Sequence, residues 1–162
     1  MAAHDKDGYF RTGDIARREG EYYWILGRAS LDIIKSGGYK ISALDVEREL
    51  LGLPYISEAM VVGVEDEEFG QRVAAVVTLQ EEKVVYSASR RLTIECLRSD
   101  LRKTLVGYKM PTLLRVLDGE LPKGQTGKVL KKILGPELFP CPGWDRHPEI
   151  QVWSRNLARP KL

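Results

Sequence analysis

The sequence predicts an α+β domain, namely a small mixed β-sheet with packed helices, plus an N-terminal β-hairpin. Two continuous apolar runs, residues 59–64 and 73–79, are typical of strands that are covered on both faces. Two further segments, which begin near Ala43 and Ile94, repeat apolar residues at helical spacing. The resulting order of strand, hairpin, helix, two strands, helix and strand indicates helices packed on one mixed sheet.

Three strands are expected in the first part of the chain, at residues 22–26, 31–35 and 39–41. The first is aromatic and β-branched, which is typical of a strand. The other two flank Gly37 and Gly38, which suit a tight hairpin turn. Residues 5–20 are polar and carry glycines, so we expect a loop there with a short extended piece at residues 9–11.

Two helices are predicted from apolar stripes and the residues that flank them. The first opens at Ser42, which stands three residues before Asp45 as in a capping box, and it stops before Pro54. The second ends near Gly107 and Pro111, residues typical of a helix C-terminus. The stripes recur at three- and four-residue intervals and consist of Ala43, Val46, Leu50 and Leu53, and of Ile94, Leu97, Leu101 and Leu105.

The last third of the chain divides into a structured part and a tail. Residues 112–117 predict a strand, residues 118–128 a polar loop with glycines, and residues 129–134 a short amphipathic segment. Five of the eight prolines fall in residues 136–162. Because no helical or strand period continues there, we expect an irregular, proline-rich tail.

The composition excludes several classes of protein. The 162 residues suit one domain with at most an appendage. The chain has 25 Lys and Arg and 23 Asp and Glu, and the resulting net charge of +2 is too small to indicate a surface that binds nucleic acid or a membrane. Cys96 and Cys141 cannot form a disulfide scaffold or a zinc site. No apolar run approaches a membrane span, and the first residues resemble neither a signal nor a transit peptide.

Two glycine-bearing segments could bind a nucleotide or another anion. In YFRTGD, Asp14 follows a glycine, so its carboxylate could accept both ribose hydroxyls or could simply bond its own turn. Further on, Arg28 offers a planar fork for ribose or phosphate oxygens. Lys35 and Lys40 flank the glycine turn and suit an anionic ligand, although an ordinary hairpin with solvated lysines is the alternative.

A third segment, LPKGQTGK, ends in Lys128. Pro122 stiffens its start and the glycines permit a tight curve, so Lys128 would be held where its charge could neutralise a reacting phosphate and carboxylate. The alternative is a basic helix start beside a turn. A phosphate-binding P-loop is excluded, because two residues separate the glycines where four are needed and Val129 replaces the Mg²⁺-binding Ser or Thr.

Taken in this order, YFRTGD, GR…DIIKSGGYKISALDVE and LPKGQTGKV resemble the C-terminal domain of the adenylate-forming superfamily of acyl-CoA synthetases, luciferases and peptide-synthetase adenylation domains. The resemblance covers roughly residues 7–134. Within the superfamily, residues 32–47 and the segment from Gly63 to Val73 are most similar to mitochondrial malonyl-CoA synthetases.

The resemblance implies a role for each candidate residue. Asp14 would hold the ATP ribose, Arg28 would contact the ribose and phosphates, and Lys128 would bridge the carboxylate and the α-phosphate during adenylation. The glycine turn would line the channel for the CoA pantetheine, with a basic residue near the CoA nucleotide. The residues of this second group are Ser36, Gly37, Gly38 and Lys40.

The resemblance also implies a reaction and a partner. A small carboxylic acid and ATP give an acyl-adenylate and diphosphate, and the CoA thiol then releases AMP, while a lid domain rotates between the two steps. Residues 28–135 would form the lid, residues 1–27 the linker from an N-terminal adenylation domain, and residues 136–162 the tail. The acid pocket and the Mg²⁺ ligands are expected in that other domain, so the chain would be inactive alone and would hold no metal.

Three points stay open at this level. The hinge could be Ser30, Leu31 or Asp32, because the loop after Arg28 is one residue longer than in relatives. The resemblance implies a mitochondrial location, with the cytoplasm as the alternative. A stand-alone module that binds a nucleotide, CoA or a partner without catalysis is the alternative function, and neither hypothesis involves nucleic acid.

Overall fold

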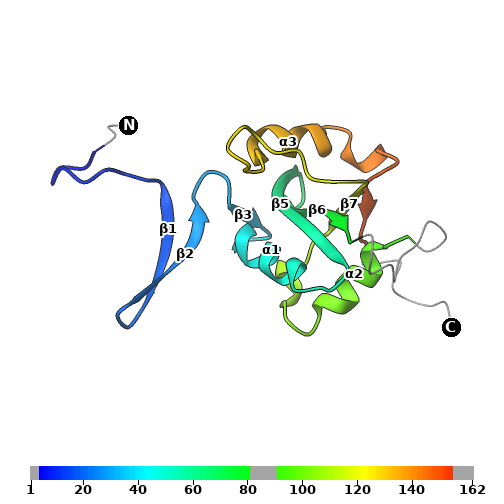
Figure 1. The fold of residues 1–162 in the computed structure, drawn as a ribbon, viewed down its shortest axis with the longest axis horizontal. Helices are drawn as coiled ribbons and strands as arrows, with labels where there is room; N and C mark the ends of the chain where they lie inside the picture. Colours follow the sequence, from blue (N-terminus) through cyan, green and yellow to red (C-terminus); the bar gives the residue numbers. More distant parts are fainter. Residues whose placement is uncertain (1–3, 81–90, 155–162) are drawn as a thin grey trace.

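The chain builds a central sheet with helices on both faces and a two-stranded hairpin that projects from it (Figure 1). The structure is a computed structural model that describes residues 4–80 and 91–154. The strands are β1 (Asp14–Glu19), β2 (Tyr22–Arg28), β3 (Ile33–Ser36), β4 (Tyr39–Ser42), β5 (Ile56–Asp66), β6 (Gly70–Leu79), β7 (Leu113–Leu117) and β8 (Gln151–Val152). The helices are α1 (Ala43–Leu51), α2 (Ile94–Leu101) and α3 (Lys131–Leu138), with 3-10 turns η2 (Gly107–Lys109) and η3 (Trp144–Arg146).

The central sheet is mixed, which confirms the predicted fold class. β5 and β6 pair antiparallel along almost their whole length, and β6 pairs in parallel with β7. α2 lies in the long connection that a parallel pair requires. β3 pairs with β6 at Ser36 and Gly70, and β4 pairs with β3 at one edge of the sheet. β8 pairs with β7 at the other edge.

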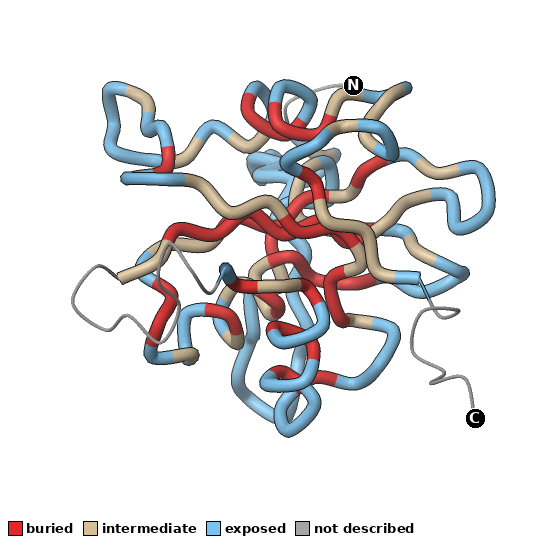
Figure 2. The backbone as a smooth tube through the Cα atoms, turned by 90° about the vertical axis from the view of Figure 1, so that its right-hand side faces the viewer, coloured by how far each residue is buried: buried red, intermediate tan, exposed pale blue. Residues whose placement is uncertain are grey.

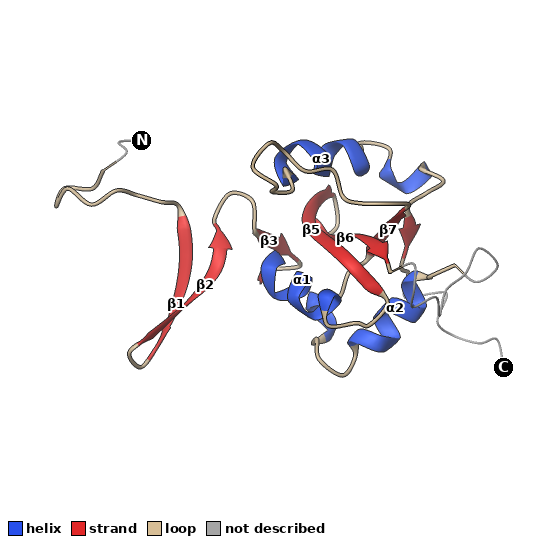
Figure 3. Ribbon diagram, in the orientation of Figure 1, coloured by secondary structure: helices blue, strands red, loops and turns tan. Residues whose placement is uncertain are grey.

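The two long strands bury side chains on both faces, which produces two apolar cores. Val61 and Ala75 belong to the core on the side of α1 and α2, whereas Met60 and Val76 belong to the core on the side of α3. Figure 2 shows the buried residues running through the middle of the molecule, and Figure 3 shows helices on both sides of the sheet. Because neighbouring residues along a strand point to opposite faces, both strands are apolar throughout.

A strand forms at the N-terminal side where the sequence predicts a loop. β1 pairs antiparallel with β2 over the whole of DIARRE, although all six of its residues are exposed. The expectation of a loop at residues 5–20 is therefore wrong for residues 14–19. The apolar signal is missing because backbone pairing with an aromatic partner strand, rather than burial, holds β1 in place.

The segment after Gly135 is also more regular than the sequence predicts. α3 continues through Pro136, and β8 joins the sheet by pairing with β7. Phe139 and Ile150 are buried in the core on the α3 side. The prediction of an irregular tail is wrong for these elements, because burial of a few large side chains outweighs the proline-rich composition. Residues 155–162 of the predicted tail lie outside the described residues.

The hairpin of β1 and β2 exposes large apolar side chains. It projects away from the sheet and helices at the N-terminal side of the molecule (Figure 1). Tyr22, Tyr23, Trp24 and Ile25 are each more than half exposed. Exposed apolar side chains in this number are typical of a surface that another polypeptide segment covers.

Candidate functional site

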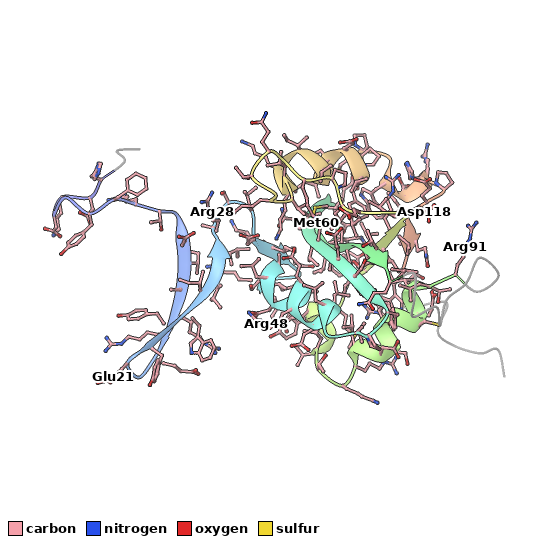
Figure 4. The ribbon with its side chains drawn as sticks, in the orientation of Figure 1. Glu21, Arg28, Arg48, Met60, Arg91 and Asp118 are labelled. Atoms are coloured by element: carbon pink, nitrogen blue, oxygen red, sulfur yellow. The ribbon has the colours of Figure 1, made fainter. Side chains whose placement is uncertain are left out.

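Asp14 and Arg28 lie opposite each other where the hairpin joins the rest of the chain, and Figure 4 labels Arg28 at this junction. Arg28 Nε lies 3.7 Å from Asp14 Oδ1, and both side chains are exposed. The turn before Asp14 is bonded by Thr12, whose Oγ1 accepts the Asp14 N–H at 3.1 Å. Two residues that the sequence predicts for nucleotide binding therefore face the same accessible space.

The chain after Arg28 forms a tight turn that Asp32 holds. Leu31 N–H and Asp32 N–H donate to Arg28 O at 3.2 and 2.8 Å, and Asp32 Oδ2 accepts the Arg28 N–H at 2.9 Å. Gly27 has a φ of 120°, and a Cβ at this position would overlap the Cβ of Asp32, so only glycine fits. We call residues 28–32 the junction turn, and the predicted hinge residues Ser30, Leu31 and Asp32 all lie in it.

Lys128 lies on an exposed arm between β7 and α3, which we define as residues 122–130. The arm closes at a bridge between Lys123 and Val129, and Gly124 N–H donates to Lys128 O at 2.9 Å. Gly127 adopts a φ of 73°, which costs glycine little. Because Lys128 is exposed, its side chain can reach a group that lies outside this chain.

The start of the arm is anchored to β5 by Glu58. Lys123 Nζ lies 2.5 Å from Glu58 Oε1, and Leu121 N–H donates to Glu58 Oε2 at 2.6 Å. These two hydrogen bonds hold the pKa of Glu58 below its ordinary value. Leu121 itself is buried, so the arm starts from a fixed point.

The end of the arm is anchored by three partly buried charged side chains, which we call the Lys131 cluster. Lys131 is the first residue of α3, and its Nζ lies 2.7 Å from both Asp32 Oδ1 and Glu47 Oε1. The three side chains are between 13% and 15% exposed. Glu47 also accepts the N–H of Val61 at 2.7 Å. The cluster therefore joins α3 to α1, to β5 and to the junction turn.

One lysine faces two carboxylates in this cluster, and their pKa values move in opposite directions. Burial raises the pKa of Glu47, and the charge and hydrogen bond of Lys131 offset this effect only in part. Burial acts in the same sense on Asp32, but hydrogen bonds from Lys131 and from the Arg28 N–H outweigh it and lower the pKa of Asp32. Glu47 is therefore the carboxylate of the pair that is protonated first as the pH falls.

Replacing Glu47 by glutamine is expected to change how stability depends on pH. Because folding raises the pKa of Glu47, its contribution to the free energy of unfolding is complete below the unfolded-state value of 4.5 and is lost as the pH rises through the folded-state pKa. As the pH rises across that window, the free energy of unfolding of Glu47→Gln should increase relative to that of the wild type. Urea unfolding at a series of pH values measures this difference, with the exposed Glu95→Gln as control. Parallel pH profiles for the wild type and Glu47→Gln would contradict the raised pKa.

The glycine turn joins β3 to β4, as the sequence predicts. Ser36 and Tyr39 are register partners, and Gly37 and Gly38 between them have φ values of 55° and 84°. A two-residue loop with both φ values positive is the turn that suits the twist of an antiparallel hairpin. Gly37 N–H donates to Phe69 O at 2.9 Å, which fixes the turn against the connection between β5 and β6.

A cavity of about 760 Å³ opens beside the glycine turn. Tyr39 and Tyr108 line it and stack on each other, with ring centroids 4.2 Å apart. Arg72 and Arg98 also line the cavity, but Arg72 pairs with Asp66, and Arg98 donates to the carbonyls of Met110 and Pro111. The exposed Lys40 is the second residue after the turn. Because both arginines already have protein partners, the stacked aromatic faces are what the cavity offers, and they suit a ligand that carries a planar ring.

The two groups of candidate residues lie at opposite ends of β3. The junction turn precedes Ile33, and Ser36 begins the glycine turn. Since a strand rises by about 3.3 Å per residue, the four steps from Asp32 to Ser36 separate the two ends by roughly 13 Å. Arg28 and the anchored arm belong to the first end, and the cavity belongs to the second.

The anchors of the arm are not predicted from the sequence; they are Glu47, Glu58, Lys123 and Lys131. Asp32 and Lys131 are 99 positions apart, so no local pattern relates them. The one signal in the sequence is a basic residue three positions after Lys128, which equally suits an exposed helix start.

Within residues 4–80 and 91–154, no three His, Cys, Asp or Glu side chains are grouped so that they could hold a metal ion. Over the same ranges, no helix combines the length and the apolar character needed to cross a membrane.

The fold and the site define a class of protein, the C-terminal domain of enzymes that bind AMP. The sequence model of the AMP-binding enzyme C-terminal domain matches residues 45–128, and the chain belongs to this family. Curated relatives include the mitochondrial malonate–CoA ligase of Mus musculus, 46% identical over 139 residues that cover 86% of this chain and 22% of the relative. The malonate–CoA ligase of Arabidopsis thaliana is 40% identical over 142 residues, which cover 82% of this chain and 22% of the relative.

Solved structures show the same likeness. The o-succinylbenzoate–CoA synthetase of Bacillus subtilis, in complex with its acyl-adenylate intermediate, matches with a TM-score of 0.69 and 32% identity. ATP-bound MatB from Rhodopseudomonas palustris matches with a TM-score of 0.68 and 29% identity. Each match covers 82% of this chain and 25% of the solved chain. The resemblance to the adenylate-forming superfamily is confirmed, and this chain spans about a quarter of the length of these proteins.

Proposed function

We propose that this chain is the lid domain of an ATP-dependent acid–CoA ligase. In the first step, a carboxylate attacks the α-phosphate of ATP and gives an acyl-adenylate and diphosphate. In the second step, the CoA thiol attacks the acyl carbon and AMP leaves. Asp14 and Arg28 would hold the ribose and phosphates, and Lys128 would stabilise the charge of the reacting carboxylate and phosphate. The residues proposed to take CoA are Ser36, Gly37, Gly38 and Lys40.

The observation that carries this proposal is the separation of the two groups along β3. A lysine is useful while negative charge builds up on the phosphate, but it would afterwards stand in the path of the thiol. Rotation of a rigid domain about the junction turn would exchange one end of β3 for the other at a single reacting centre. The rigid lid would begin at residue 28 and extend beyond residue 135, because α3 and β8 pack on the same sheet.

An adenylation domain outside these 162 residues is the proposed partner. The relatives are about four times as long as the matched region, which leaves room for such a domain. The exposed aromatic side chains of β2 offer an apolar surface on which it could pack. The acid pocket and the Mg²⁺ ligands would belong to that domain, and residues 1–27 would link the two.

Malonate or methylmalonate is the proposed acid. This choice rests on the names of relatives from Mus musculus and Arabidopsis thaliana, which are malonate–CoA ligases and align with more than four fifths of this chain. The mouse relative is a mitochondrial protein by name, and we propose the same location here.

A fusion protein tests the proposed function. In it, this chain replaces the matching region of the Mus musculus malonate–CoA ligase, and malonate-dependent ATP–diphosphate exchange and malonyl-CoA formation are measured. We expect the fusion to be active and the 162-residue chain to be inactive alone. Exchange by the chain alone would overturn the need for a second domain. A folded but inactive fusion, together with tight CoA or AMP binding by the chain, would favour a stand-alone binding module that uses the 760 Å³ cavity.

A further inference from the structure

We propose that Lys131 is a positioning residue that couples the junction turn to the arm bearing Lys128. The inference deepens the proposed function and rests on it. The ammonium group of Lys131 is enclosed by Asp32 and Glu47, so it is placed to hold protein groups rather than a substrate. Its effect on the reaction would therefore be indirect, through the place that it gives to Lys128.

The arm is held at its two ends, and the anchors differ in what they join. At the start, Glu58 ties Lys123 to β5, a strand of the rigid sheet. At the end, Lys131 begins α3 and bonds Asp32 of the junction turn. Between these anchors, the arm is closed by backbone hydrogen bonds such as that from Gly124 to Lys128. A change in the junction turn can therefore reach the arm through Lys131.

A single carboxylate links Lys131 to the backbone of the hinge. Asp32 Oδ1 contacts Lys131 Nζ at 2.7 Å, while Asp32 Oδ2 accepts the Arg28 N–H at 2.9 Å. Rotation of the backbone within residues 28–32 must turn this carboxylate or break one of the two bonds. The ion pair therefore joins the arm to the last residue of the junction turn, which the anchor at Glu58 does not.

Glu47 would allow the cluster a second arrangement. With both carboxylates ionised, the partly buried cluster carries one negative charge more than Lys131 neutralises. If Asp32 turns away with the hinge, Lys131 and Glu47 remain as a neutral buried pair, and Glu47 keeps its bond from the Val61 N–H. The arm would then be released from the hinge without leaving a buried lysine unpaired.

A cycle of substitutions in the 162-residue chain tests the coupling without any enzyme activity. Amide hydrogen exchange at Gly124 and Gly127 reports on the arm, and exchange at Val76 reports on the core. We expect Asp32→Asn to speed exchange in the arm by about tenfold, as expected when a charged hydrogen bond is lost. In the Lys131→Met background, Asp32→Asn should add no further change. The matched control is Lys132→Met, which removes the same charge at the exposed neighbouring position.

The coupling would be overturned if Asp32→Asn sped amide exchange in the arm equally in the wild-type and Lys131→Met backgrounds. It would also be overturned if Asp32→Asn left exchange in the arm unchanged. If exchange at Val76 shows that Lys131→Met does not fold, Lys131→Gln takes its place in the cycle. Lys131→Arg keeps a cation between the carboxylates, and it should restore the response of the arm to Asp32→Asn.

The fusion protein separates positioning from a merely structural role. We expect Lys131→Met to slow malonate-dependent ATP–diphosphate exchange by about tenfold, and to leave the conversion of supplied malonyl-adenylate to malonyl-CoA unchanged. Lys131→Arg should recover most of the exchange rate. Equal losses in both steps would overturn the positioning role. An inactive wild-type fusion would instead count against the proposed function, because the amide-exchange cycle judges the coupling by itself.

Discussion

Replacing Lys128 by alanine in the fusion protein is expected to slow malonate-dependent ATP–diphosphate exchange by about a hundredfold to a thousandfold. The reason is electrostatic, because a positioned ammonium group stabilises negative charge that builds up only as carboxylate and phosphate react. Lys128 lies on an arm that is anchored at both ends, so the charge is held in place before the reaction begins. A single-turnover measurement with malonate and ATP gives the rate of this step directly.

The second half of the reaction provides the internal comparison for Lys128→Ala. Conversion of supplied malonyl-adenylate to malonyl-CoA should keep the wild-type rate, because this step is proposed to use the glycine turn at the other end of β3. Stability should change by less than about 0.5 kcal/mol, since Lys128 is exposed. Lys103→Ala removes an exposed lysine elsewhere and is the matched control. Equal loss in both half-reactions would show that Lys128 does not act in adenylation specifically.

Replacing Phe139 by alanine is expected to destabilise the fold by about 3–5 kcal/mol. Phe139 is 1% exposed and belongs to the core between the sheet and α3, although it lies in the segment that the sequence predicts to be irregular. Truncation removes its ring from the core and leaves a cavity among neighbours such as Leu138 and Leu113. Urea unfolding of the 162-residue chain, followed by circular dichroism, measures the change.

Phe10→Ala is the matched control for Phe139→Ala. Phe10 is 64% exposed on the N-terminal side, so its truncation should cost less than about 0.5 kcal/mol. If the two substitutions shifted the unfolding midpoint equally, the segment after Gly135 would not be packed as described. A large effect of Phe139→Ala would show that this segment is part of the domain.

The accuracy of the fold prediction follows the burial of each element. Residues 59–64 and 73–79 are predicted correctly as strands, because a strand covered on both faces must be apolar at every position. β1 is not predicted because it is exposed along its length, so its pairing with β2 does not require a pattern of apolar residues in the sequence. β8 was missed because two residues carry no periodicity, and its place depends on the neighbouring strand β7.

The candidate site shows the same division between local and distant information. The glycine turn is predictable because Gly37 and Gly38 adopt φ values that disfavour other residues. The curved arm before Lys128 is predictable for a similar reason, from its proline and glycines. The ion pair of Lys131 with Asp32 is not predictable, because neither residue differs in type from an ordinary surface charge.

By itself, the sequence determined the class of fold, the tight turns and the family to which the chain belongs, because these depend on residues close together in the chain or on the character of whole runs. The tertiary structure alone decided that Asp14 faces Arg28, that Phe139 is buried, and that Lys131 joins the arm to the junction turn. The physical reason is that burial and charge pairing depend on distances in space. Contacts across as many as 99 positions are set only when the sheet brings its flanking segments together.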